Sequence, residues 1–206
     1  MRTSRTKPGM ILFLCFSFVL AVPASSAPGP DQFRQLLQES SLRFEAPPGY
    51  TDIKPVANPV LHYERALQHQ SGQLEIRIVI RPLGRIVIDY SNPHNAKPEP
   101  NHLFPLLFES MTAALSRGGR TPSSAYPYDQ AHSLFNADWA AATVLDVSPD
   151  FSSTYDQALL IAIHKDGLAD AYTIFLFNEY EHAKEFITPA LAALSFTPQE
   201  AVGLSR

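Results

Sequence analysis

Three residues that can move protons or bind a metal ion lie close together in the chain: His164, Asp166 and Asp170. A histidine beside carboxylates can act as a general base or supply metal ligands. Asp166-Gly167 also sits between two apolar runs, which is typical of a tight hairpin turn, and such turns are polar because water surrounds them. We therefore interpret the three as solvated turn residues. The alternative is a hydrolase or metal-dependent enzyme centred on His164 and the nearby aspartates.

A second set of candidate ligands lies around a proline-rich stretch, Ser91 to Pro100. His94 and His102 flank Glu99, and two histidines with one glutamate can form a zinc site. Closed metal sites need ligands on rigid elements, and a long loop does not hold its side chains in one geometry. We therefore predict no metal here, and treat both histidines as candidate binding residues on a loop.

The single tryptophan lies in a cluster that suits the binding of a partner or a small ligand. Asn136 and Asp138 precede Trp139, and Tyr126 and Tyr128 lie a few residues earlier. Aromatic side chains near polar groups are enriched at binding interfaces. A tryptophan packed in the core with its N–H bonded locally is the alternative, since large aromatic side chains are buried on average. These five residues are the predicted binding site.

Motifs that mark common enzymes are absent from the sequence. It contains no G-x-S-x-G, no P-loop, no H-E-x-x-H and no G-x-G-x-x-G. We therefore predict no catalytic residues and no cofactor.

The first 27 residues read as a secretory signal peptide. Arg2, Arg5 and Lys7 form a positive start, and an apolar run of 13 residues, 10–22, is short for a membrane span. Small residues precede Pro28. We expect an exported protein, periplasmic or secreted, without a membrane span after the signal is removed.

The charge of the remaining chain argues against nucleic acid as a partner. Loss of the three basic residues of the signal leaves 13 of 16 Lys and Arg against 20 Asp and Glu, which is a net charge near −7. The only cysteine, Cys15, leaves with the signal, so a disulfide is excluded. A protein or a component of the cell envelope remains as the expected partner.

The hydrophobic pattern of the sequence predicts the strands and helices that would position these residues. Tyr155 to Phe177 forms two apolar runs around Lys165-Asp166-Gly167, which predicts a hairpin covered on both faces at the centre of a sheet. Residues 104–115 carry an apolar helical face. In residues 73–81, Leu and Ile alternate with charged residues, so we expect Glu75, Arg77 and Arg81 to face solvent.

The order of elements is strand, hairpin, helix, strand, hairpin, helix. Strands joined by short turns are antiparallel, so the fold class is α+β. We expect an antiparallel sheet of about six strands layered with two main α-helices. The predicted divisions are a signal peptide at 1–27, a linker and short helix at 28–40, one domain at 41–198 and a tail at 199–206.

The layout resembles the PsbP and Mog1-like fold group, which includes small exported bacterial domains. The resemblance rests on LRFEAPPGY at 42–50, the long antiparallel sheet, the helices against it, and LAALSF at 191–196. It implies a PsbP-like or Mog1-like sandwich that works in binding or assembly rather than catalysis. It supplies no catalytic set for residues of this chain.

Cleavage of the signal peptide gives the first testable prediction. N-terminal sequencing of the protein recovered from its native compartment should begin near Pro28, because the small residues before it suit the processing enzyme. Recovery of the intact chain from the cytosol, still beginning at Met1, would contradict export.

Overall fold

The computed structural model describes residues 30–86, 99–118 and 121–198. The predicted signal peptide and tail, and His94, lie outside these residues. The elements follow in chain order: α1 Pro30–Glu39, β1 Leu42–Phe44, β2 Tyr50–Ile53, β3 Arg65–His69, β4 Glu75–Pro82, η1 Leu83–Arg85, η2 Pro100–His102, α2 Phe104–Leu115, β5 Ser123–Ala125, α3 Tyr128–Phe135, β6 Trp139–Asp146, β7 Gln157–Lys165, β8 Ala169–Phe177, α4 Tyr180–Ile187, η3 Thr188–Ala190 and β9 Leu194–Phe196.

A seven-stranded antiparallel sheet in the order β2-β3-β4-β8-β7-β6-β5 forms the centre of the fold. The predicted hairpin is confirmed as β7 and β8, which pair from Gln157 with Phe177 to Lys165 with Ala169. All nine residues of β8 are buried. The α+β class with an antiparallel sheet is confirmed, with seven strands where about six were expected.

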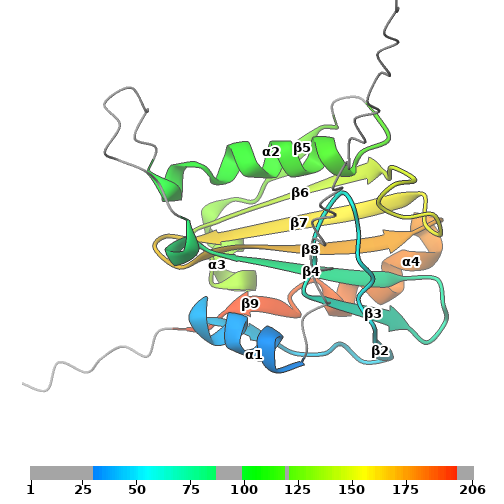
Figure 1. Ribbon diagram of the computed structural model, residues 1–206, viewed down its shortest axis with the longest axis horizontal. Helices are drawn as coiled ribbons and strands as arrows, with labels where there is room; N and C mark the ends of the chain where they lie inside the picture. Colours follow the sequence, from blue (N-terminus) through cyan, green and yellow to red (C-terminus); the bar gives the residue numbers. More distant parts are fainter. Residues whose placement is uncertain (1–29, 87–98, 119–120, 199–206) are drawn as a thin grey trace, which may run out of the picture.

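A second, two-stranded sheet joins the two ends of the domain. β1 pairs with β9, so that Leu42 faces Phe196 although 154 residues of chain separate them. These strands belong to the two sequence segments that carry the resemblance to the PsbP and Mog1-like group. Figure 1 shows β9 and α1 together at one side of the main sheet.

The main sheet is covered on both faces, as the apolar runs of β7 and β8 predict. One face packs against α2 and against the segments before β3 and before β7, with Phe104, Phe108 and Tyr172 among its buried residues. The other face packs against α1, α3, α4 and the β1–β9 pair, with Phe175 and Phe177 among its buried residues. Helix α1 contributes Phe33 and Leu36 to this second core.

The expected exposure of the charged residues of β4 is wrong for Glu75 and Arg77, which are both buried. Arg77 Nε donates to Glu75 Oε1 over 2.7 Å, and Arg77 Nη1 donates to the Phe151 carbonyl over 2.8 Å. Its guanidinium lies over the rings of Tyr63 and Phe151, 4.8 and 4.6 Å from their centres. The two segments that carry these rings cover the face that the alternation alone assigned to solvent.

Because both faces of the central hairpin are buried, we expect its apolar side chains to contribute strongly to stability. Phe175→Ala should lower the free energy of unfolding by about 2–5 kcal/mol, because Phe175 is fully buried and the cavity left behind would remain unfilled. Denaturant titration measures this loss, and Leu106→Ala on the exposed side of α2 serves as a control, with an expected change within about 0.5 kcal/mol. A loss below about 1 kcal/mol for Phe175→Ala would show that β8 is not the centre of the fold.

Candidate functional site

An open pocket of about 360 Å³ lies at the end of the sheet where the β7–β8 hairpin turns. Three stretches that are distant in sequence line it: η2 with the start of α2, the residues before and at the start of β6, and the hairpin tip. The lining residues are Asn101, His102, Phe104, Pro105, Asp138, Trp139, His164 and Asp166. Figure 1 shows the beginning of α2 and the tip of the hairpin at the same end of the molecule.

His164 forms the floor of the pocket and is held by two carboxylates. It lies near the end of β7, opposite Asp170 of β8. Its Nδ1 is 2.7 Å from Asp170 Oδ1, and its Nε2 is 2.9 Å from Asp166 Oδ1. His164 and Asp170 are 4% and 0% exposed, whereas the Asp166 side chain is 70% exposed. One imidazole therefore links a buried carboxylate to one at the surface.

Aromatic side chains enclose the imidazole on the α2 side. The Phe104 ring, at the first position of α2, stacks on His164 with centres 5.0 Å apart. The same phenylalanine makes an edge contact with Trp139, with ring centres 4.3 Å apart. Trp139 faces His164 across the β6–β7 pair. Phe104 was not among the predicted site residues, although it is the first apolar residue of the predicted helix.

Backbone amides of the hairpin tip bind side chains from the neighbouring segments. The Asp166 amide donates to Asp138 Oδ2 over 3.0 Å, and the Gly167 amide donates to Asn101 Oδ1 over 2.8 Å. Gly167 has φ +72°, a left-handed conformation that glycine adopts without strain. The turn therefore holds η2 and the start of β6 in place around the pocket.

The surroundings of His164 shift its pKa in opposing directions. Burial lowers the pKa of His164 because it disfavours the charged ring, but the hydrogen bonds and negative charges of Asp170 and Asp166 outweigh burial, so the pKa is raised above the ordinary 6.5. The protonated ring donates to both carboxylates at once, whereas the neutral ring can donate to only one of them. Protonation of His164 therefore tightens the contact between β7, β8 and the turn.

The interpretation of the three polar residues as a solvated turn is wrong for His164 and Asp170, and it holds for the exposed Asp166. Asp170 Oδ2 is buried without a hydrogen-bond partner among the described residues. His164 is buried because Phe104 of α2 stacks on its ring. The sequence pattern predicts a buried strand, but it assigns all three polar residues to the turn.

The structure brings together only part of the predicted binding cluster. Trp139, Asp138 and His102 line the pocket. Asn136 does not: it ends α3 with φ +50°, and its Nδ2 donates to the Thr197 carbonyl over 3.0 Å. Tyr126 packs against Phe135 on the other face of the sheet.

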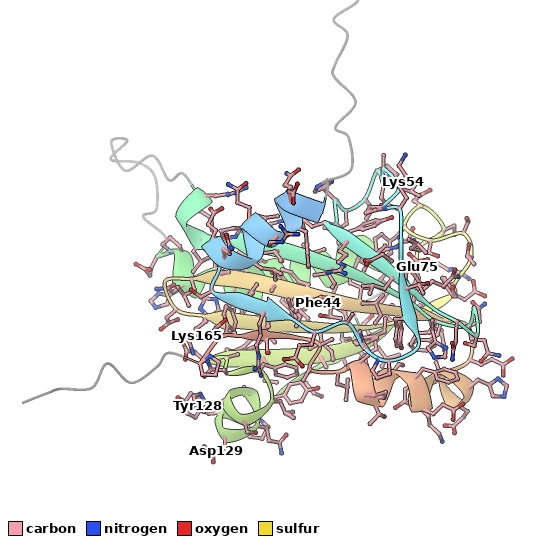
Figure 2. The ribbon with its side chains drawn as sticks, turned by 90° about the horizontal axis from the view of Figure 1, so that it is seen from below. Phe44, Lys54, Glu75, Tyr128, Asp129 and Lys165 are labelled. Atoms are coloured by element: carbon pink, nitrogen blue, oxygen red, sulfur yellow. The ribbon has the colours of Figure 1, made fainter. Side chains whose placement is uncertain are left out.

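Tyr128 lies apart from the pocket on the outer side of α3. It is 62% exposed and stacks on His132, with ring centres 5.9 Å apart. Figure 2 shows Tyr128 and Asp129 on α3, and Lys165 at the same end of the sheet. Lys165 Nζ donates to the Asn136 carbonyl over 2.6 Å.

The described lining residues limit the covalent chemistry that the pocket can perform. They include no serine, threonine, cysteine or lysine, and the aspartates and histidines are the groups that could act as nucleophiles. Both ring nitrogens of His164 are engaged by carboxylates, so a substrate would have to displace Asp166 to reach Nε2. Within the described ranges, no group of three or more His, Cys, Asp or Glu residues is arranged to hold a metal ion.

Comparison with known proteins finds a similar solved structure and no matching family. No family model and no curated protein matches it. Among solved structures it is similar to the solution structure of cyanobacterial PsbP (CyanoP) from Synechocystis sp. PCC 6803, with 10% identity and a TM-score of 0.43. The match covers 78% of this chain and 89% of that chain.

The predicted PsbP-like resemblance thus has a counterpart among solved structures. At this identity the likeness concerns the fold alone, and no function follows from it. In the described part of the chain, no helix has the length and apolar character needed to cross a membrane.

The raised pKa of His164 predicts a pH-dependent contribution to stability. A group whose pKa is higher in the folded state stabilises the protein fully below its unfolded pKa of 6.5, and the contribution is lost as the pH rises through the folded pKa. The difference in the free energy of unfolding between the parent and His164→Asn should therefore be larger at pH 5.5 than at pH 9. Urea titrations across this range measure it. A difference independent of pH would contradict the ion-paired histidine.

Proposed function

We propose that this protein is an exported, non-catalytic binding or assembly-accessory protein whose contact site is the pocket at the β7–β8 turn. One observation carries the proposal: a partly exposed tryptophan and two carboxylates line one open pocket, and the histidine that lines it with them already has both ring nitrogens bonded. Large aromatic side chains beside polar groups are the residues on which binding energy concentrates. The partner is a protein or a component of the cell envelope.

Export supports this role because a periplasmic or secreted protein meets such partners. The proposal of export depends on the predicted signal at residues 1–27 and on its apolar run. The excess of acidic residues makes nucleic acid a poor partner for the described surface, because phosphate groups would repel it.

The alternative is a hydrolase or metal-dependent enzyme centred on His164, and the buried Asp170 is the observation in its favour. A carboxylate on Nδ1 orients an imidazole that acts as a general base at Nε2. The alternative requires Asp166 to leave Nε2. An enzyme of this type would lose about 10²–10⁴-fold in rate on His164→Asn, whereas a binding protein that stays folded would retain its partner.

Photo-cross-linking in the native compartment tests the binding role. A benzophenone amino acid placed at His102, an exposed residue of the pocket, should yield an adduct of defined mass. Trp139→Ala should lower the yield of that adduct about tenfold or more, because truncation of an aromatic anchor is among the most costly changes at an interface. Mass spectrometry identifies the adduct, and circular dichroism confirms that the variants are folded.

The control carries the same benzophenone at Asp150, an exposed residue in the β6–β7 connection at the other end of these strands. It should give no adduct with the same partner. Equal adducts from positions 102 and 150, or an adduct at 102 that folded Trp139→Ala and Asp166→Asn variants leave unchanged, would contradict a binding role for the pocket.

A further inference from the structure

We infer that the pocket receives an arginine side chain of a protein partner, whose guanidinium contacts the carboxylates of Asp138 and Asp166 beside Trp139. This inference rests on the proposed binding role of the same pocket and adds the chemistry of the ligand. It concerns recognition alone and requires no bond to form or break.

The charges that line the pocket favour a cation. Asp138 and Asp166 both line it, and within the protein each carboxylate accepts one short hydrogen bond. A carboxylate has room for about four acceptor bonds, so both keep capacity for a ligand. The buried carboxylate of Asp170 adds negative charge behind His164.

Lys165, a basic side chain next to Asp166 in the chain, does not line this pocket. Among the lining residues that the structure describes there is neither lysine nor arginine. Lys165 directs Nζ to the Asn136 carbonyl and lies 5.9 Å from the centre of the Phe196 ring, which belongs to the opposite core. Although Nζ is also 3.9 Å from Asp138 Oδ1, the other oxygen of Asp138 is bonded to the turn amide that borders the pocket.

The aromatic wall favours arginine over lysine. A guanidinium is planar, bonds carboxylates through two parallel N–H groups, and stacks on aromatic faces, whereas an ammonium is a compact and strongly hydrated charge. Among aromatic side chains, tryptophan attracts a cation most strongly, and Trp139 lines this pocket. The pocket therefore combines the two surfaces that arginine contacts at the same time.

The protein already binds its own arginines in this way. Arg77 bonds Glu75 and lies over Tyr63 and Phe151. Arg65 bonds both oxygens of Asp52, over 2.6 and 2.8 Å, and lies over the rings of Phe33 and Phe44. In the pocket, carboxylates and an aromatic side chain are present together, and the described lining residues include no arginine.

His164 makes the proposed binding dependent on pH. The imidazolium and the ligand would compete for Asp166, so deprotonation of His164 frees this carboxylate and strengthens binding. Arginine stays charged throughout, so the change comes from the protein. The titratable and charged groups around His164 on the packed elements are Asp166, Asp170, Tyr172, Asp138, His102 and Arg81.

Titration with a short peptide tests the inference directly. The probe is acetyl-Gly-Arg-Gly amide, and its matched control carries citrulline, which has nearly the same shape and no charge. Trp139 is the only tryptophan of the chain, so its indole N–H resonance reports on the pocket without ambiguity. The arginine peptide should shift this resonance to saturation with an affinity about tenfold above that of the citrulline peptide, because hydrogen bonds to charged partners are the stronger ones.

Variants of single charges complete the test. Asp166→Asn and Asp138→Asn should each weaken the arginine peptide several-fold, whereas Asp150→Asn removes the same charge from the other end of the strands and should leave the affinity unchanged. The affinity of the parent should rise from pH 5.5 to pH 8.5, and His164→Asn should abolish this rise. Equal binding of the arginine and citrulline peptides, or of arginine and lysine peptides, would overturn the inference.

The outcome is separable from that of the proposed function. Failure of the arginine peptide, together with a cross-link at position 102 that depends on Trp139, would leave the binding role in place and refute the arginine ligand. Loss of both results would refute the binding role itself.

Discussion

The fold depends on the burial of both faces of the β7–β8 hairpin. A strand covered on both sides needs two separate layers, and here α2 with two long connections forms one, while α1, α3, α4 and the β1–β9 pair form the other. Such a strand also cannot leave polar side chains to water, so each buried polar group must find its partner inside the protein. The ion-paired side chains on the α2 face, Glu75 with Arg77 and Asp170 with His164, follow from this constraint.

The pair of His164 and Asp170 connects the buried strands to the turn at the surface. The His164 imidazole contacts Asp166 at the turn, and the turn amides donate hydrogen bonds to Asp138 and Asn101 from two other segments. The pocket forms where three stretches of chain meet, 101–105, 138–139 and 164–166. Asp138 and Asp166 give it a negative lining, whereas Lys165 directs Nζ to the Asn136 carbonyl.

The hydrogen bonds of His164 differ from those of a catalytic histidine. A catalytic histidine presents a free nitrogen to its substrate and uses the other for an orienting partner. His164 has the orienting partner in Asp170, but Asp166 occupies the second nitrogen, and the described lining residues include no serine, threonine, cysteine or lysine. What the pocket does present is an indole, two carboxylates with remaining acceptor capacity and a half-buried amide at Asn101.

Local sequence determined the elements of this protein, and tertiary structure decided the environment of its polar residues. The Asp166-Gly167 pair between apolar runs, and the helical spacing from Phe104 to Leu115, identified β7, β8 and α2 because turn geometry and hydrophobic periodicity depend on neighbouring residues alone. The sequence predicts that Glu75 and Arg77 face solvent, because the alternation of apolar and charged residues identifies a strand but not the segments that cover it. His164, near the end of β7, and Asp166, in the turn, are two residues apart, yet one is buried and the other exposed. Phe104, 60 residues earlier in the chain than His164, stacks on its ring, and contacts at that separation form when the layers pack.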